Sequence, residues 1–93
     1  MSTHYLHSVI ENLSIEDIFL LTHLKERDST EKFKSVSRKS LLEELIKKQP
    51  AMTEATVRKS VNRLEALLFI NLITSGRKQR IFITNLGLQA LEN

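Results

Sequence analysis

Apolar residues recur at three- and four-residue steps in the first third of the chain, and this spacing predicts an amphipathic helix over about 15–27. Ser14 and Asp17 stand three residues apart in front of it, which is the arrangement of a capping box. The stretch 28–36 is polar and loses the periodicity, so we expect a loop there. The residues expected to face inward are Ile15, Ile18, Phe19, Leu21 and Leu24.

Two further helices are predicted, separated by a short turn. Ser37 is a good N-cap for a helix over about 38–48, and Pro50 prevents that helix from continuing. Thr53 can cap the longest periodic run in the chain, which we expect to be helical over 53–69. The pattern therefore predicts a helix, a tight turn and a second helix.

The helix predicted over 53–69 has two different faces. Four apolar side chains fall within about 60° of one another on a helical projection and form the expected buried stripe: Val57, Val61, Leu64 and Leu68. The opposite face carries small, amide and cationic side chains, which are unsuited to a core and suited to a groove: Ala55, Lys59, Asn62 and Ala66, flanked by Thr56, Arg58 and Arg63.

After Asn71 the periodicity changes to two, which predicts a β-hairpin wing over 70–84 with Gly76 in its turn. Thr84 can cap a short last helix over 85–92. The leader, 1–13, has apolar residues at helical spacing. It is expected either to pack on the core as a helix or to form a dimer contact.

Positive charge is concentrated in the second half of the chain. Residues 53–80 contain six basic and two acidic side chains, a balance of +4, whereas the remaining positions together carry −1. A solvated charged face would give such a balance, and so would a surface that binds a polyanion such as nucleic acid.

The stretches TEATVRKSVNRLEALLFI at 53–70 and GRKQRIFITNLGLQALE at 76–92 resemble winged-helix transcription regulators of the MarR-like group. The resemblance implies a mainly α fold with a small β-hairpin wing, in which the helix-turn-helix and the wing bind DNA. The resemblance covers roughly residues 14–92, with scaffold helices over 14–48. The length of 93 residues itself predicts one domain over 1–93. Leu68 stands where members commonly have a glycine, and the last helix is shorter than theirs.

The chemistry of the side chains agrees with this resemblance. A helix fits the major groove, where Lys and Arg donate to guanine and Asn pairs with adenine. Hydroxyls and helix N-terminal amides suit phosphate oxygens, and basic wing residues suit the backbone or minor groove. The predicted DNA-binding residues are Thr53, Ala55, Thr56, Arg58, Lys59, Asn62, Arg63, Arg77, Lys78 and Arg80.

The sequence offers no catalytic or metal-binding group, and we expect neither an enzyme nor a cofactor. Cysteine is absent, and His4, His7 and His23 are expected to be surface or interface residues. No apolar run approaches the ~20 residues of a transmembrane helix, so we expect a cytoplasmic protein without a membrane partner.

Three functions remain open from the sequence. The first is a sequence-specific, homodimeric repressor of transcription that reads double-stranded DNA. The second keeps the DNA contact but assigns it to replication or plasmid partition. The third is a winged-helix protein-interaction module that does not contact DNA. The sequence does not identify the operator, the direction of regulation or any small-molecule effector.

Overall fold

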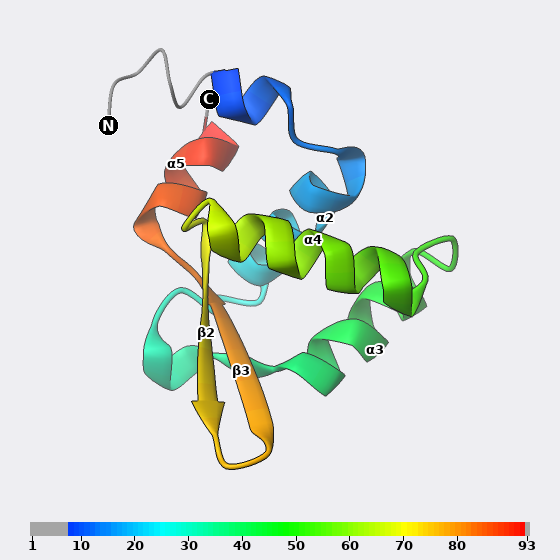
Figure 1. Cartoon of the computed structure of the whole chain (residues 1–93), viewed down its shortest axis with the longest axis vertical. Helices are drawn as coiled ribbons and strands as arrows, with labels where there is room; N and C mark the ends of the chain where they lie inside the picture. Colours follow the sequence, from blue (N-terminus) through cyan, green and yellow to red (C-terminus); the bar gives the residue numbers. More distant parts are fainter. Residues whose placement is uncertain (1–7, 93) are drawn as a thin grey trace.

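The computed structural model describes residues 8–92, in which helices pack beside a small antiparallel sheet (Figure 1). A short helical segment covers 8–11. The elements that follow are α2 (Ile15–Glu26), the 3-10 helix η1 (Lys32–Lys34), β1 (Val36–Ser37), α3 (Arg38–Lys48), α4 (Glu54–Ala66), β2 (Ile70–Ser75), β3 (Lys78–Ile83) and α5 (Asn85–Glu92). This is the mainly α fold with a β-hairpin wing that the sequence predicted.

Hydroxyl side chains cap the N-termini of four helices, as the local sequence predicts. Ser14 accepts from the amide of Asp17, whose carboxylate accepts from the Ser14 amide, which completes a capping box on α2. Ser37, Thr53 and Thr84 accept from the amides three residues further on, at the starts of α3, α4 and α5. These caps satisfy amides that would otherwise have no partner within the helix.

The sheet has three strands in the order β1-β3-β2, not the two of the predicted hairpin. β2 and β3 pair over their whole length, with Leu72 opposite Ile81. β1 pairs with the other edge of β3, Val36 opposite Ile81. The prediction of a plain loop over 28–36 was therefore wrong only at η1 and at Val36. The strand was missed because two residues have no periodicity of their own and form a strand only by pairing with a distant one.

The core lies where α2 packs against α4, α5 and β3. Its central residues are fully buried and come from every layer: Leu20, Leu21 and Leu24 of α2, Leu41 and Leu45 of α3, Val61 and Leu64 of α4, and Ile81 and Ile83 of β3. The helix α4 and the wing are thus anchored to one hydrophobic core. The wing extends away from the helices, with its turn at the far end of the molecule (Figure 1).

The predicted helix over 53–69 ends earlier, at Ala66, and Leu68 does not belong to its buried stripe. Leu68 adopts a positive φ of 65° and is 66% exposed. The amide of Phe69 donates to the carbonyl of Leu64 and that of Leu68 to the carbonyl of Glu65, which is a Schellman ending. Leucine therefore occupies a left-handed position that favours glycine, and the chain turns there into β2.

The one glycine of α5 allows that helix to lie against the junction between α4 and β2. A methyl group at Gly87 would overlap the carbonyl oxygen of Phe69 and the side chain of Ile83. Thr84 reinforces this junction, because its hydroxyl donates to the carbonyl of Leu68 at 2.6 Å while also accepting from the Gly87 amide. The absence of a side chain at Gly87 is thus required by close packing.

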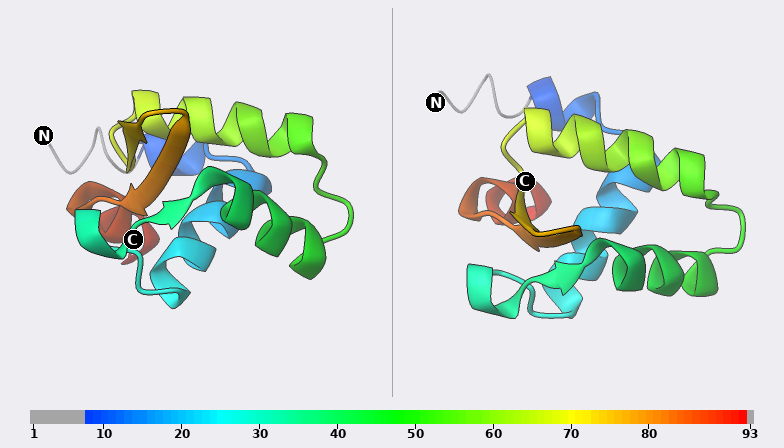
Figure 2. Two further views of the ribbon diagram at one scale, coloured as in Figure 1. Left: turned by 90° about the horizontal axis from the view of Figure 1, so that it is seen from below. Right: turned by 60° about the horizontal axis from the view of Figure 1, so that its bottom comes forward.

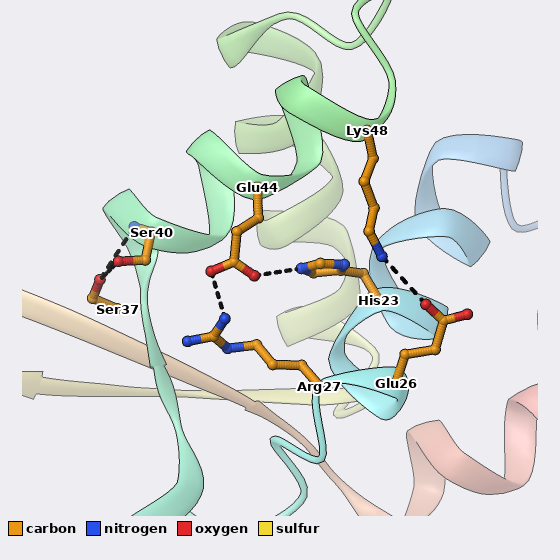
Figure 3. Close-up of polar contacts among 7 residues, drawn as sticks. All are labelled: His23, Glu26, Arg27, Ser37, Ser40, Glu44 and Lys48. Carbon is orange, nitrogen blue, oxygen red and sulfur yellow. Dashed lines mark hydrogen bonds and ion pairs between the residues drawn. The ribbon is translucent and has the colours of Figure 1, made fainter.

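A polar cluster joins α2 to α3 (Figure 3). His23 is 6% exposed, and its Nε2 donates to the carboxylate of Glu44 at 2.8 Å. The guanidinium of Arg27 binds the second oxygen of that carboxylate at 2.5 Å, and Lys48 pairs with Glu26 beside it. The prediction that His23 is a surface or interface residue was wrong, because its side chain is buried between α2 and α3 within the fold. His4 and His7 lie outside the described residues.

Candidate nucleic-acid interface

The two helices of the predicted helix-turn-helix, α3 and α4, are joined by the turn over 49–53, and the hairpin lies beside them (Figure 2). Val57, Val61 and Leu64 hold α4 on the core. The anchored stripe turns the other side of α4 to solvent, and this is the face that the sequence marked as suited to a groove.

The outward face of α4 carries the predicted base-reading residues. Ala55, Arg58, Lys59 and Asn62 are all exposed. Arg58 Nη2 makes an exposed pair with Glu54 Oε1 at 3.3 Å, one helical turn away. Surface pairs of this kind contribute only a few tenths of a kcal/mol, so they hold the guanidinium loosely. The donors of this face are available to a ligand.

The start of α4 holds the two predicted threonines. Thr53 Oγ1 accepts from the Thr56 amide at 3.2 Å, and the two hydroxyls lie 3.0 Å apart. Thr53 is exposed and Thr56 is half-buried. The first-turn amides and the positive end of the helix dipole lie beside them, which is an arrangement that favours anions.

The wing presents two of its three predicted cations at its tip. Gly76, with a φ of 63°, and Arg77 form the turn, and Lys78 begins β3. Both cations are exposed. Their long side chains therefore extend from the end of the hairpin that lies furthest from the core.

Arg80 has a partner within the fold. Its Nε donates to Ser35 Oγ at 2.9 Å, and its Nη2 donates to the carbonyl of Ser35. Since Ser35 immediately precedes β1, these bonds fasten β3 to the edge of the sheet. The Arg80 guanidinium thus stabilises the base of the wing, whereas Arg77 and Lys78 are at the tip.

Arg63 also has a partner within the fold. Its Nε lies 2.8 Å from Asp17 Oδ2 and its Nη2 lies 2.9 Å from Oδ1, so the guanidinium binds the buried carboxylate through both oxygens. Burial alone would raise the pKa of Asp17, but the hydrogen bonds from Arg63 and from the Ser14 amide outweigh it and lower that pKa. The pair holds α4 against α2.

The sequence analysis missed the contribution of α3. Two adjoining hollows lie on this side of the molecule, one between α3 and α4 and one between α3 and the wing. Arg38, at the start of α3, lines both, and Lys39 lines the second. Arg38 Nη1 also donates to Gln79 Oε1 of the wing at 2.7 Å. No sequence periodicity reveals this, because the residues are 41 positions apart.

The hollows form a basic groove. We use this name for the surface that lines the two hollows. In the described part of the chain, its charged residues are cations from three elements and one acidic residue: Arg38 and Lys39 of α3, Arg58 of α4, Arg77, Lys78 and Arg80 of the wing, and Glu54 of α4. The groove therefore joins the helix-turn-helix to the wing in a continuous surface of positive charge.

No protein-family model matches the chain. The chain is 32% identical over 88 residues to the DNA-binding protein TubR of Priestia megaterium (strain ATCC 12872 / QMB1551), a match that spans 95% of this chain and 82% of that protein. The chain belongs to the TubR family. The solved structure of TubR from Bacillus megaterium pBM400 superposes with a TM-score of 0.87 at 31% identity, covering 98% of this chain and 96% of that chain.

Similarity to TubR supports the winged-helix fold that the sequence predicted, whereas the specific resemblance to MarR-like regulators is not confirmed. Within residues 8–92 no group of three His, Cys, Asp or Glu side chains is arranged to hold a metal ion. None of the helices in that part of the chain is long and apolar enough to span a membrane.

Proposed function

We propose that this protein binds double-stranded DNA, with α4 in the major groove and the wing against the adjacent backbone or minor groove. The observation that carries the proposal is the basic groove, which combines α3, the exposed face of α4 and the wing on a fold shared with the DNA-binding protein TubR. A continuous cationic surface of this kind attracts the phosphates of a duplex.

Within this proposal the exposed side chains divide by their chemistry. Lys59, Asn62 and Arg58 donate to base edges, with Ala55 allowing close approach. Thr53, Thr56 and the first-turn amides of α4 bind phosphates, as do Arg77 and Lys78 of the wing. Two further predicted contacts, Arg63 and Arg80, are assigned here to positioning, because their guanidinium groups are bound to Asp17 and Ser35.

Among the uses of DNA binding, we place plasmid partition ahead of the transcriptional repressor that the MarR-like resemblance implied. The support is the similarity to TubR, whose solved structure comes from pBM400, a designation in the form used for plasmids. A partition protein binds several neighbouring sites, whereas a repressor binds an operator beside a promoter. A footprint on the DNA surrounding the gene separates these two uses.

We also propose a homodimer, because one recognition helix reads only a few base pairs and two half-sites multiply the discrimination. Apolar residues at the start of α2 are available for the contact: Ile15 is 83% exposed and Ile18 is 42% exposed. Ile15 also lines a hollow, together with Phe19, Met52 and other residues near the helix-turn-helix turn. Sedimentation at micromolar concentration, with and without DNA, tests this. A 10.7 kDa species alone would refute the dimer.

Base reading is tested with Lys59→Ala and Asn62→Ala. Each variant is expected to weaken binding to a selected duplex by about 1–3 kcal/mol while changing the affinity for random duplex much less, since base-edge contacts carry the discrimination. Gel shifts on both duplexes measure the difference. Equal losses on the two duplexes would refute base reading.

The same gel shifts test the protein-interaction alternative. A winged helix that serves only an acidic protein partner would bind neither the selected nor the random duplex at low salt. Binding that weakens with rising salt supports the proposed function. Absence of binding to both duplexes would refute it.

A further inference from the structure

One acidic side chain lies among the cations of the basic groove. Glu54 is the first residue of α4 and lines both hollows, the one beside α3 and the one beside the wing. Its side chain is 66% exposed. The carboxylate therefore faces the space that the proposed function assigns to DNA.

The local structure gives Glu54 only a small role in stability. A carboxylate in the first turn interacts favourably with the helix dipole, and the exposed pair with Arg58 adds little to stability. The cap of the helix comes from Thr53, not from Glu54. These effects would be obtained equally on any surface helix, and they do not account for a negative charge in a cationic groove.

The electrostatic effect on DNA is unfavourable unless the carboxylate meets a donor. A carboxylate repels phosphates and has no hydrogen to offer the acceptor atoms of guanine. In the major groove it accepts from the exocyclic N4 amino group of cytosine. Arg58, released from its loose pair with Glu54, is then free to donate to a neighbouring guanine or phosphate.

We propose that Glu54 is a specificity-determining residue, which accepts a hydrogen bond from a cytosine amino group and disfavours binding to duplexes that lack it at that position. This inference rests on the proposed function, since it assigns to one residue of the groove the discrimination between sequences. Glu54 thus lowers the affinity of the protein for DNA of any sequence and increases its selectivity between sequences.

The experiment compares the wild type with Glu54→Gln, Glu54→Ala and the control Glu65→Gln. Glu65 is exposed near the other end of α4, about 16 Å away along the helix, so its change removes the same charge outside the groove. All four proteins are used to select duplexes from a library with a random central segment. Their affinities for unselected random duplex are then measured at 0.1 M salt.

The wild type and the Glu65→Gln control are expected to select cytosine at one position. Glu54→Gln is expected to prefer adenine there, because a carboxamide pairs with adenine, and Glu54→Ala is expected to lose the preference at that position alone. Both Glu54 variants should bind random duplex about threefold more tightly, the effect of one charge about 4 Å from a phosphate after screening. Glu65→Gln should give a much smaller gain.

Two kinds of failure are distinguishable. A wild type that binds no duplex refutes the proposed function itself. A wild type that binds DNA, combined with Glu54 variants that select the wild-type sequences or bind random duplex no better than Glu65→Gln, overturns the inference about Glu54 and leaves DNA binding intact. Circular dichroism of the four proteins verifies that each is folded.

Discussion

The guanidinium of Arg63 binds both carboxylate oxygens of Asp17, and this pair connects α4, which we propose reads DNA, to the central helix α2. Asp17 is fully buried, and it also accepts from the amide of Ser14 in the capping box. One carboxylate thus belongs to the capping box that begins α2 and also ties α4 to that helix.

We predict that Arg63→Ala lowers the free energy of unfolding by about 2 kcal/mol, because it leaves a buried acceptor without its strongest partner. Arg63→Lys should recover only part of this loss, since an ammonium cannot bind both oxygens in the planar geometry of a guanidinium. Urea unfolding of the three proteins measures it. Arg58→Ala is the control, because its pair with Glu54 is exposed and its removal should change stability little. Equal stability of the two alanine variants would contradict the prediction.

The Asp17 pair also predicts acid sensitivity. The pKa of Asp17 is lowered in the folded protein, because the hydrogen bonds from Arg63 and Ser14 outweigh the effect of burial. The unfolded chain therefore binds this proton first, and the stabilisation, complete above the unfolded pKa of about 3.9, is lost as pH falls through the folded pKa. Urea unfolding between pH 3 and pH 7 should show stability declining below about pH 5. Asp17→Asn should be less stable at neutral pH and should have a shallower decline. Parallel curves would exclude Asp17 as the group responsible.

A further prediction assigns different roles to the two ends of the wing, DNA contact to its tip and stability to its base. Replacing Arg77 and Lys78 by alanine should reduce the slope of log affinity against log salt by up to about 1.8, because each phosphate that the wing no longer neutralises keeps about 0.9 of a counterion. Thermal unfolding should change little, since both residues are exposed at the turn.

The control for the wing is Lys25→Ala combined with Lys32→Ala, which removes the same charge from α2 and η1, outside the residues that line the basic groove. Its salt slope should stay close to that of the wild type. Arg80→Ala, in contrast, should lower thermal stability, because it removes the bonds to Ser35. An unchanged slope in the tip variant would mean that the wing does not contact the backbone.

The left-handed residue at the end of α4 gives a prediction of increased stability. Leu68→Gly should raise the free energy of unfolding by about 0.5–1 kcal/mol. The left-handed conformation costs a leucine roughly 1–2 kcal/mol in the folded protein, and glycine avoids this cost. Glycine also gives the unfolded chain more conformational freedom, which offsets part of the gain. Ala66→Gly, two residues earlier within the helix, should lower it by about 1 kcal/mol. Thermal or urea unfolding measures both. Destabilisation by both glycines would show that the Leu68 side chain stabilises the junction more than its conformation destabilises it.

Local sequence determined the helices and their beginnings. The caps at Ser14, Ser37, Thr53 and Thr84 were predictable because a hydroxyl bonds to an amide only three residues away. The buried stripe of α4 and the alternation in the hairpin were likewise readable, since each depends on the period of one element. These features, with the concentration of positive charge in residues 53–80, were enough to predict the fold and a DNA-binding face.

Tertiary structure decided what depends on residues far apart in the chain. The strand β1 exists only through its pairing with β3, and the burial of His23 depends on Glu44 of another helix. The sequence shows Arg63 and Arg80 as cations like Arg58 and Arg77, yet two of the four are bound to Asp17 and Ser35 within the fold. The charge of a side chain follows from its residue type alone. The group that binds this charge depends on which helices and strands the core brings together. Folding therefore divided one set of basic residues into those that hold the structure and those that remain available to a ligand.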